Sequence, residues 1–225
     1  MLRRAWLAIL LATAGGVAQA APIDDLVMAA ELNDGRAVLR LLLQGVDPNG
    51  PDARGRRAIF MAVREESQRA LESLLASPLT QVNAVNGQGE TPLMIAAIRG
   101  QLPAVKALVQ RGAEVNRAGW TPLHYACSGP DNGVAAFLLV QGAEVNARSE
   151  NGTTPLMMAA RYGNSDLVPV LLAAGAEPRA ANEQELTAAD FAERGGRDGM
   201  AKELRRLMRE RQQAADAARR AASAP

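Results

Sequence analysis

The stretch Gly89-Glu90-Thr91-Pro92-Leu93-Met94-Ile95-Ala96-Ala97 decides the fold, because close copies of it recur along the chain. The copies are Gly119-Trp120-Thr121-Pro122-Leu123-His124-Tyr125-Ala126 and Gly152-Thr153-Thr154-Pro155-Leu156-Met157-Met158-Ala159-Ala160. Thr is a good N-cap, and Pro suits the first helical position, where its missing N–H is no loss. Each copy therefore predicts the start of a helix, and Thr187-Ala188-Ala189-Asp190-Phe191-Ala192 predicts another in weaker form.

Apolar pairs recur with a period near 33 residues. They begin at Leu41, Leu74, Leu108, Leu138 and Leu171, and Leu204 continues the series, with spacings of 33, 34, 30, 33 and 33. A glycine follows four residues later at Gly45, Gly112, Gly142 and Gly175, where a helix end needs a left-handed residue. Asn49, Asn83, Asn116 and Asn146 then mark the starts of turns. This period predicts helical hairpins that bury their apolar faces only by stacking on their neighbours.

This pattern resembles the ankyrin repeat over residues 22–209. The resemblance implies an all-α ankyrin-repeat solenoid of stacked helix-turn-helix units with short β-turn fingers, about five to six repeats including the caps. The predicted units are 22–54, 55–88, 89–118, 119–151 and 152–184, followed by 185–209 as the C-terminal cap.

Four departures from the pattern carry expectations of their own. The first unit is predicted to be an N-terminal cap, with Asp24, Asp25, Glu31 and Arg36 available for its outer face. The second has Gly55-Arg56-Arg57-Ala58-Ile59-Phe60 in place of the Thr-Pro-Leu motif. The finger between Asn116 and Gly119 is three residues shorter than its counterpart between Asn146 and Gly152. Pro169 is expected to interrupt a second helix by removing one backbone hydrogen bond.

Residues 1–20 resemble a cleavable signal peptide. Arg3 and Arg4 are basic, residues 5–14 form a short apolar run, and Ala18-Gln19-Ala20 is a small-x-small cleavage site. An uncleaved membrane anchor is the alternative, but Gly15 and Gly16 interrupt the run, which is also short for a bilayer. We therefore expect cleavage after Ala20 and a periplasmic or secreted protein. A bacterial source fits the near-exclusive use of Arg as the basic residue, with Lys only at Lys106 and Lys202.

Charge excludes a global attraction to nucleic acid, since the formal net charge is +1. Residues 194–225 nevertheless hold nine basic and four acidic residues. Within them, the Ala- and Arg-rich tail 210–225 is interpreted as a solvated frayed helix or a disordered segment. The alternative is an electrostatic arm toward an acidic partner or anionic lipid, which is the only membrane contact the sequence suggests.

The residues that usually carry catalysis or bind metal are scarce. The chain has one His and one Cys, so it offers no zinc site of known spacing, and it contains no phosphate-binding Gly-rich motif. His124 occupies the place of Phe60, Met94 and Met157 in other units, which predicts a packing or helix-capping role. Cys127 occupies the place of Ala97 and Ala160, which predicts a small core residue. We expect no catalytic residue, no cofactor and no metal.

The resemblance implies that a monomer binds another protein on the concave surface, formed by the turn tips and the exposed side of each first helix. Mapping that surface onto this sequence selects Arg56, Arg64, Glu65, Gln88, Glu90, Ile98, Arg99, Trp120, Ser128, Glu150, Asn151, Thr153, Arg161 and Tyr162. Trp120 stands out, because Trp and Arg dominate interface hot spots; alternatively, it packs over the short finger. The predicted function is that of a non-enzymatic adaptor, inhibitor or immunity-type protein. The alternative is a membrane-surface scaffold, or an accessory factor to an envelope or stress-defence enzyme, that uses the basic tail.

Overall fold

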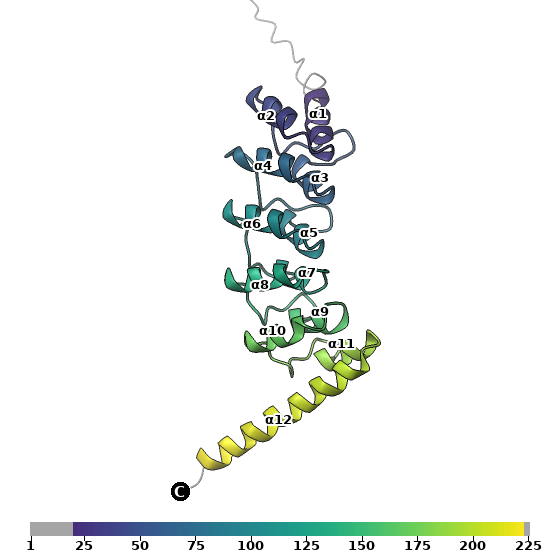
Figure 1. Ribbon diagram of the computed structural model, residues 1–225, viewed down its shortest axis with the longest axis vertical. Coiled ribbons are helices and arrows are strands. Elements are labelled where there is room, and N and C mark those ends of the chain that lie inside the picture. The colour runs from purple at the N-terminus through teal and green to yellow at the C-terminus, as the bar shows by residue number, and fades with distance from the viewer. Residues whose placement is uncertain (1–19, 223–225) are drawn as a thin grey trace, which may run out of the picture. The chain divides into compact units, whose positions relative to one another are not determined.

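The computed structural model describes residues 20–222 of the 225-residue chain, and this part contains twelve helices and no strand (Figure 1). The predicted signal peptide lies almost entirely outside the described residues, which begin at its last residue, Ala20. The chain divides into two compact units, Met1–Thr80 and Gln81–Pro225. Among the helices of residues 20–222, none combines the length and the apolar character that crossing a bilayer requires.

The first compact unit contains two helical hairpins, which correspond to the first two predicted repeats. Helices α1 (Ala20–Glu31) and α2 (Gly35–Leu43) form one hairpin, and α3 (Ala58–Arg64) and α4 (Gln68–Ala76) form the other. The first helices α1 and α3 pack together, as do the second helices α2 and α4. The two hairpins are therefore stacked in parallel, as the period predicted.

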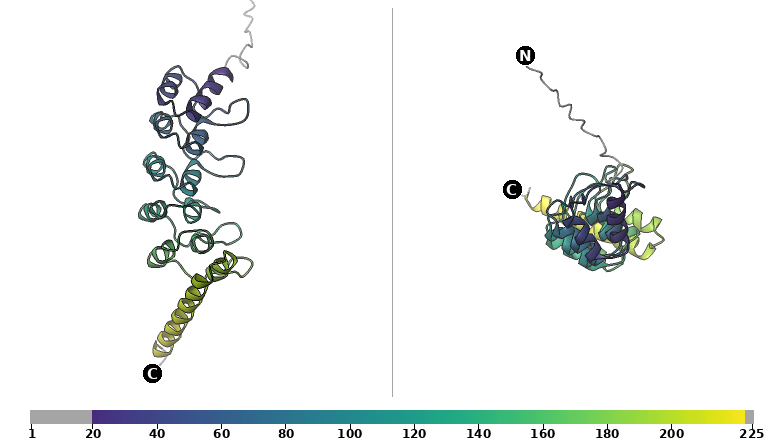
Figure 2. Two further views of the ribbon diagram at one scale, coloured as in Figure 1. Left: turned by 45° about the vertical axis from the view of Figure 1, so that its right-hand side comes forward. Right: turned by 90° about the horizontal axis from the view of Figure 1, so that it is seen from above.

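The second unit contains four hairpins. Their first helices are α5 (Pro92–Ile98), α7 (Pro122–Ala126), α9 (Pro155–Arg161) and α11 (Ala188–Arg194). Their second helices are α6 (Leu102–Gln110), α8 (Asn132–Val140), α10 (Leu167–Ala173) and the long α12 (Asp198–Ala222). The first helices pack in series, and α6, α8 and α10 form a second row (Figure 1). Figure 2 shows the loops between hairpins projecting away from that second row. These loops are the fingers.

The helix boundaries follow the local sequence. Thr91, Thr121, Thr154 and Thr187 are the N-caps of the four first helices in this unit, as predicted. Gly45, Gly112, Gly142 and Gly175 have positive φ between 84° and 94° just after the second helices. At Gly112, the N–H of glycine donates to Val109 and the N–H of Ala113 donates to Leu108, which closes the helix end. The predicted starts and stops are confirmed.

Asparagine side chains join consecutive repeats, in addition to shaping their own turns. In each case the side-chain nitrogen donates to the carbonyl of the next unit's helix-stop glycine, and Oδ1 accepts from the N–H two residues further on. The two distances are 3.3 and 2.8 Å for Asn83, 2.8 and 2.8 Å for Asn116, and 2.9 and 2.9 Å for Asn146. Three equivalent bridges therefore hold neighbouring repeats in register.

The core lies between the two helix rows. Leu93, Leu123 and Leu156 from the first helices are at most 1% exposed. Leu108, Leu138 and Leu171 from the second helices are fully buried, and the alanines beside them leave room for close helix packing. Burial of this repeating apolar set drives the stacking.

Two expectations need correction. Pro169 is the third residue of α10 and so removes no hydrogen bond, because the first four N–H groups of a helix have no partner within it. The exposed surface of the first hairpin is mixed rather than polar: Asp25 and Arg36 are exposed as predicted, but Met28 and Leu32 are also 56% and 71% exposed, and Glu31 pairs with Arg56. Of the two interpretations of the tail, the structure has the helical extension, because α12 continues without a break to Ala222.

Candidate binding surface

The fingers are closed by a polar side chain at their first position. Asp52, Asn86 and Asn182 each accept, through Oδ1, the N–H groups two and four residues later at 2.7–3.0 Å. In the fourth finger the hydroxyl oxygen of Ser149 accepts the N–H of Thr153 at 3.0 Å. These bonds give each finger a defined shape and hold its outward residues in place.

The shortened finger has a different geometry. Gly119 has a φ of 75°, and a Cβ at this position would collide with the carboxylate of Glu150 from the next finger. Glu150 therefore lies against the backbone immediately before Trp120. The short turn leaves Trp120 half-buried. Its ring and the His124 ring form a T-shaped pair with a centroid distance of 5.2 Å.

Trp120 and His124 line a pocket of about 200 Å³ in the second compact unit. The pocket opens on the face that the sequence predicted, since Ile98, Trp120 and Ser128 all line it. The other lining residues, His124, Tyr125 and Met158, were not among the predicted site residues. The repeat register carried a signal for two of them, because Tyr125 and Met158 occupy the same place in successive first helices.

His124 forms the floor and is fully buried. Its Nε2 lies 2.9 Å from the carbonyl oxygen of Thr153, and its Nδ1 lies 3.1 Å from the backbone nitrogen of Thr121. Since a carbonyl only accepts and an N–H only donates, Nε2 carries the hydrogen and Nδ1 is the acceptor. Burial lowers the pKa of the imidazole, outweighing the Thr153 carbonyl and Glu150, which favour the charged form. The predicted packing and helix-capping role is confirmed.

Tyr125 links two neighbouring repeats at the pocket. Its hydroxyl donates to Oε1 of Glu90 at 3.2 Å, while Oε2 of Glu90 accepts from the side chain of Asn86 at 2.8 Å. Burial, followed by the negative charge of Glu90 and its hydrogen bond, raises the pKa of Tyr125 to about 12. Tyr125 is therefore a neutral donor at physiological pH.

The remaining predicted residues of this unit lie at different depths. Gln88, Arg99, Glu150, Asn151 and Tyr162 are exposed, and Glu90 and Arg161 are half-buried. The Arg161 guanidinium lies 4.9 Å from the centre of the Tyr162 ring. The prediction that Thr153 is exposed is wrong, because Thr153 is only 2% exposed. Its N–H donates to the Ser149 hydroxyl oxygen, and its carbonyl oxygen accepts from His124.

The predicted residues of the first unit are Arg56, Arg64 and Glu65. Arg64 and Glu65 are exposed at the end of α3. Arg56 pairs with Glu31 at 3.0 Å and with the buried Asp52 at 2.7 Å, so it also holds its finger to α1. Burial raises the pKa of Asp52, but hydrogen bonds from the backbone and guanidinium of Arg56 and from Arg54 outweigh it and hold the pKa below its usual value.

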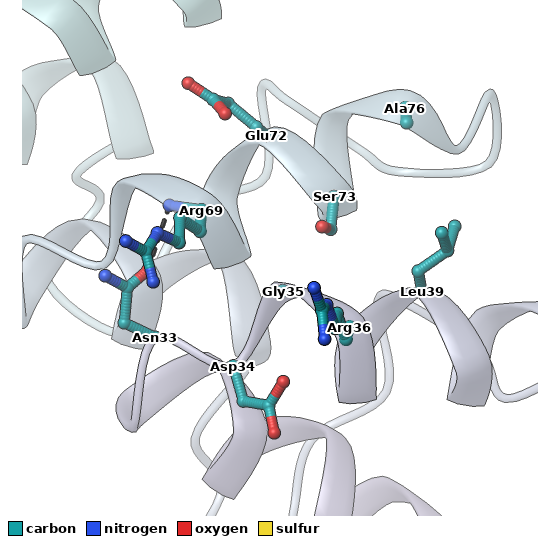
Figure 3. A pocket seen from close by; sticks show the side chains of 9 residues that line it. All are labelled: Asn33, Asp34, Gly35, Arg36, Leu39, Arg69, Glu72, Ser73 and Ala76. Carbon is teal, nitrogen blue, oxygen red and sulfur yellow. Dashed lines mark hydrogen bonds between the residues drawn. The ribbon is translucent and has the colours of Figure 1, made fainter.

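A second pocket, of about 840 Å³, lies in the first unit between α2 and α4 (Figure 3). Its lining includes Arg36, Arg69, Asp34 and Glu72, so charges of both signs meet there. The Asp34 side chain caps helix α2 by accepting the N–H of Ala37. The Asn33 side-chain oxygen accepts the N–H of Arg69 at 2.9 Å. None of the predicted site residues lines this pocket.

Cys127 is buried, and that burial raises the pKa of its thiol far above its usual value, as expected for a core residue. Within residues 20–222, no three His, Cys, Asp or Glu side chains gather closely enough to hold a metal ion.

Comparison with known proteins places these features in a family. The model for ankyrin repeats (3 copies) matches residues 26–118, 68–149, 114–182 and 130–211. This chain belongs to the ankyrin repeat family. The all-helical ankyrin solenoid predicted from the sequence is therefore confirmed, and ankyrin repeats generally mediate protein–protein interaction.

Similar ankyrin-repeat proteins are regulators or multidomain proteins. The rat ankyrin repeat and SAM domain-containing protein 6 is 37% identical over 114 residues, which cover 49% of this chain but 13% of that protein. Human protein phosphatase 1 regulatory subunit 27 is 38% identical over 71 residues, 30% of this chain and 46% of that protein. The Notch-regulated ankyrin repeat-containing protein of Xenopus tropicalis is 34% identical over 91 residues, 38% of this chain and 80% of that protein.

Proposed function

We propose that this chain is an exported, non-enzymatic binding protein that holds a partner protein on the finger and first-helix face of its second unit. The observation that carries the proposal is the pocket between Ile98, Trp120, Tyr125 and Met158, which leaves apolar and aromatic side chains accessible on that face. Accessible aromatic residues beside a concave site are the usual anchors of a protein interface.

The chemistry of the pocket supports binding rather than catalysis. Both ring nitrogens of His124 are occupied by the protein itself, and Cys127 is buried with a raised thiol pKa. Neither group is placed to transfer a proton to, or attack, a molecule in the pocket. Human protein phosphatase 1 regulatory subunit 27 carries a regulatory role in its name, which supports a similar non-enzymatic role here.

The basic end of the chain gives little support to the alternative of a membrane scaffold. After Met208, residues 209–222 contain no large apolar side chain. An interfacial helix needs such side chains on one face, so only weak electrostatic attraction to a lipid surface would remain. Adaptor, inhibitor and immunity-type roles all agree with partner binding, and the identity of the captured partner distinguishes them.

The test is affinity capture from a periplasmic extract of the source organism. Ile98→Asp places a charge on a side chain that is 40% exposed at the pocket, and Trp120→Ala removes the aromatic wall. Val140→Asp is the matched control, because Val140 is 81% exposed on the second helix α8. We expect wild type and Val140→Asp to retain the same partner and the two pocket variants to lose it. Identical partners with all four proteins would refute the proposed face.

A further inference from the structure

The size of the pocket at Trp120 restricts what can occupy it. A cavity of about 200 Å³ is smaller than the roughly 300–1,000 Å³ sites that hold drug-sized ligands. It does have room for one amino-acid side chain. If the chain binds a partner on this face, as proposed above, the pocket takes a single side chain of that partner.

The walls favour a side chain with an apolar stem. Ile98 and Met158 supply aliphatic surface, and Trp120 and Tyr125 supply aromatic surface. An aromatic ring also attracts a cation placed over its face. Lysine and arginine combine the two properties, because their methylene stems pack on apolar surface while the charged head stays accessible.

The charges around the pocket decide between a basic and a neutral side chain. Glu150 lies against Gly119, next to Trp120, and its side chain makes no hydrogen bond or ion pair with any residue in 20–222. A second carboxylate, that of Glu90, accepts a hydrogen bond from the Tyr125 hydroxyl. Both carboxylates raise the pKa of Tyr125, and Arg117 alone opposes them.

The cations nearby do not cancel this field. The Arg117 guanidinium donates to the carbonyl oxygen of Gly89 at 2.7 Å, and its charge lowers the pKa of Tyr125 by less than the charge of Glu90 raises it. The Arg161 guanidinium is stacked on the Tyr162 ring. Among residues 20–222, Glu150 is therefore a carboxylate with no hydrogen-bond or ion-pair partner, and it lies beside the backbone that precedes Trp120.

We propose that the pocket of Ile98, Trp120, Tyr125 and Met158 binds an arginine or lysine side chain of the partner, with its charge placed between the Trp120 ring and the Glu150 carboxylate. The proposal rests on the proposed function for the identity of the partner as a protein. The preference for a basic side chain stands on the pocket itself.

The test uses the purified chain and two small probes, N-acetylarginine methylamide and its neutral counterpart N-acetylcitrulline methylamide. Binding is followed by NMR through the indole N–H resonance of Trp120, which is assigned by its loss in Trp120→Phe. We expect the arginine probe to shift this resonance saturably. We expect the citrulline probe to bind several-fold more weakly, because it keeps the shape and loses the charge.

The Glu150→Gln variant tests the carboxylate, and Glu144→Gln serves as the matched control because Glu144 is an exposed acidic residue whose charge, unlike that of Glu150, does not act on His124 or Tyr125. Since exposed ion pairs are weak, Glu150→Gln should reduce arginine affinity about two- to fivefold, and added salt should reduce it further. Glu144→Gln should match wild type.

Equal binding of the two probes, an unchanged affinity in Glu150→Gln, or no shift of Trp120 would each overturn the proposal. These outcomes are separable from failure of the proposed function. Partner capture that still depends on Trp120, together with equal probe binding, would refute the basic ligand and leave the binding face intact. Partner capture that ignores Trp120 would refute the face, whatever the probes show.

Discussion

Single residues in this protein serve two neighbouring repeats at once. His124 caps α7 through Nδ1, as the sulfurs of Met94 and Met157 cap their helices, and it also holds the next finger through Nε2. Because both nitrogens are used, protonation of Nδ1 would set a donor against the N–H of Thr121. The folded chain therefore favours the neutral imidazole, in keeping with the lowered pKa of His124.

This arrangement predicts a pH dependence of stability. Burial lowers the pKa of His124 in the folded chain, whereas the unfolded chain takes up a proton near pH 6.5. As the pH falls below that value the unfolded state binds more protons, so the free energy of unfolding decreases. Urea melts from about pH 7.5 to about pH 5 should show this decrease in wild type and a smaller one in His124→Gln. Equal slopes would contradict the assignment.

Backbone strain at one finger gives a second prediction. Glu185 has a φ of 59°, at the place where Gly89 and Gly152 stand in earlier fingers. A left-handed conformation costs a non-glycine residue roughly 1–2 kcal/mol. Glycine avoids this strain, but it loses more conformational entropy on folding, which offsets part of the gain. Glu185→Gly should therefore raise the free energy of unfolding by about 0.5–1 kcal/mol in denaturant melts.

Glu183→Gly is the control, because Glu183 lies in the same exposed finger and its φ is not positive. Here glycine brings only its entropic cost, so the same melts should show a loss of stability of about 0.5–1 kcal/mol. A loss in both variants would mean that Glu185 is not strained.

Among the elements, the fingers and the helix ends are joined by the asparagine bridges. Asn146 makes two hydrogen bonds of 2.9 Å to the segment that follows α10, one as donor to Gly175 and one as acceptor from Glu177. Similar bridges from Asn83 and Asn116 show that this is a property of the repeat rather than of one site.

The bridges predict the effect of removing one. Asn146→Ala loses both hydrogen bonds and should lower the free energy of unfolding by about 1–2 kcal/mol. Asn146→Asp keeps the acceptor for Glu177 but sets a carboxylate oxygen against the Gly175 carbonyl, so its loss should be at least as large as that of Asn146→Ala. Chemical denaturation measures both. An alanine variant as stable as wild type would show that the bridges only accompany stacking.

On the scale of the whole molecule, export is the property that the described residues do not address. Helix α1 begins at Ala20, so cleavage after Ala20 would remove one residue of it and leave the rest of the first hairpin intact. Expression of the full chain in a bacterium should yield a periplasmic protein whose first residue is Ala21. Mass measurement and N-terminal sequencing check this. A cytoplasmic product that retains residues 1–20 would refute export.

The sequence by itself determined the repeat, the helix starts and stops, and the core positions of His124 and Cys127. These features depend on contacts within about four residues or on a strict period, and both can be read along the chain. It also placed Ile98, Trp120 and Ser128 on one face, because equivalent positions in a stack face the same way.

Only the tertiary structure decided which side chains reach across from one repeat to the next. The Glu90–Tyr125 bond, the position of Glu150 over Gly119 and the burial of Thr153 depend on the rotation and spacing of neighbouring units, which no local pattern records. The outward Met28 and Leu32 and the unbroken α12 have a similar cause. Terminal units lack one neighbour, so the periodic pattern does not show what covers them.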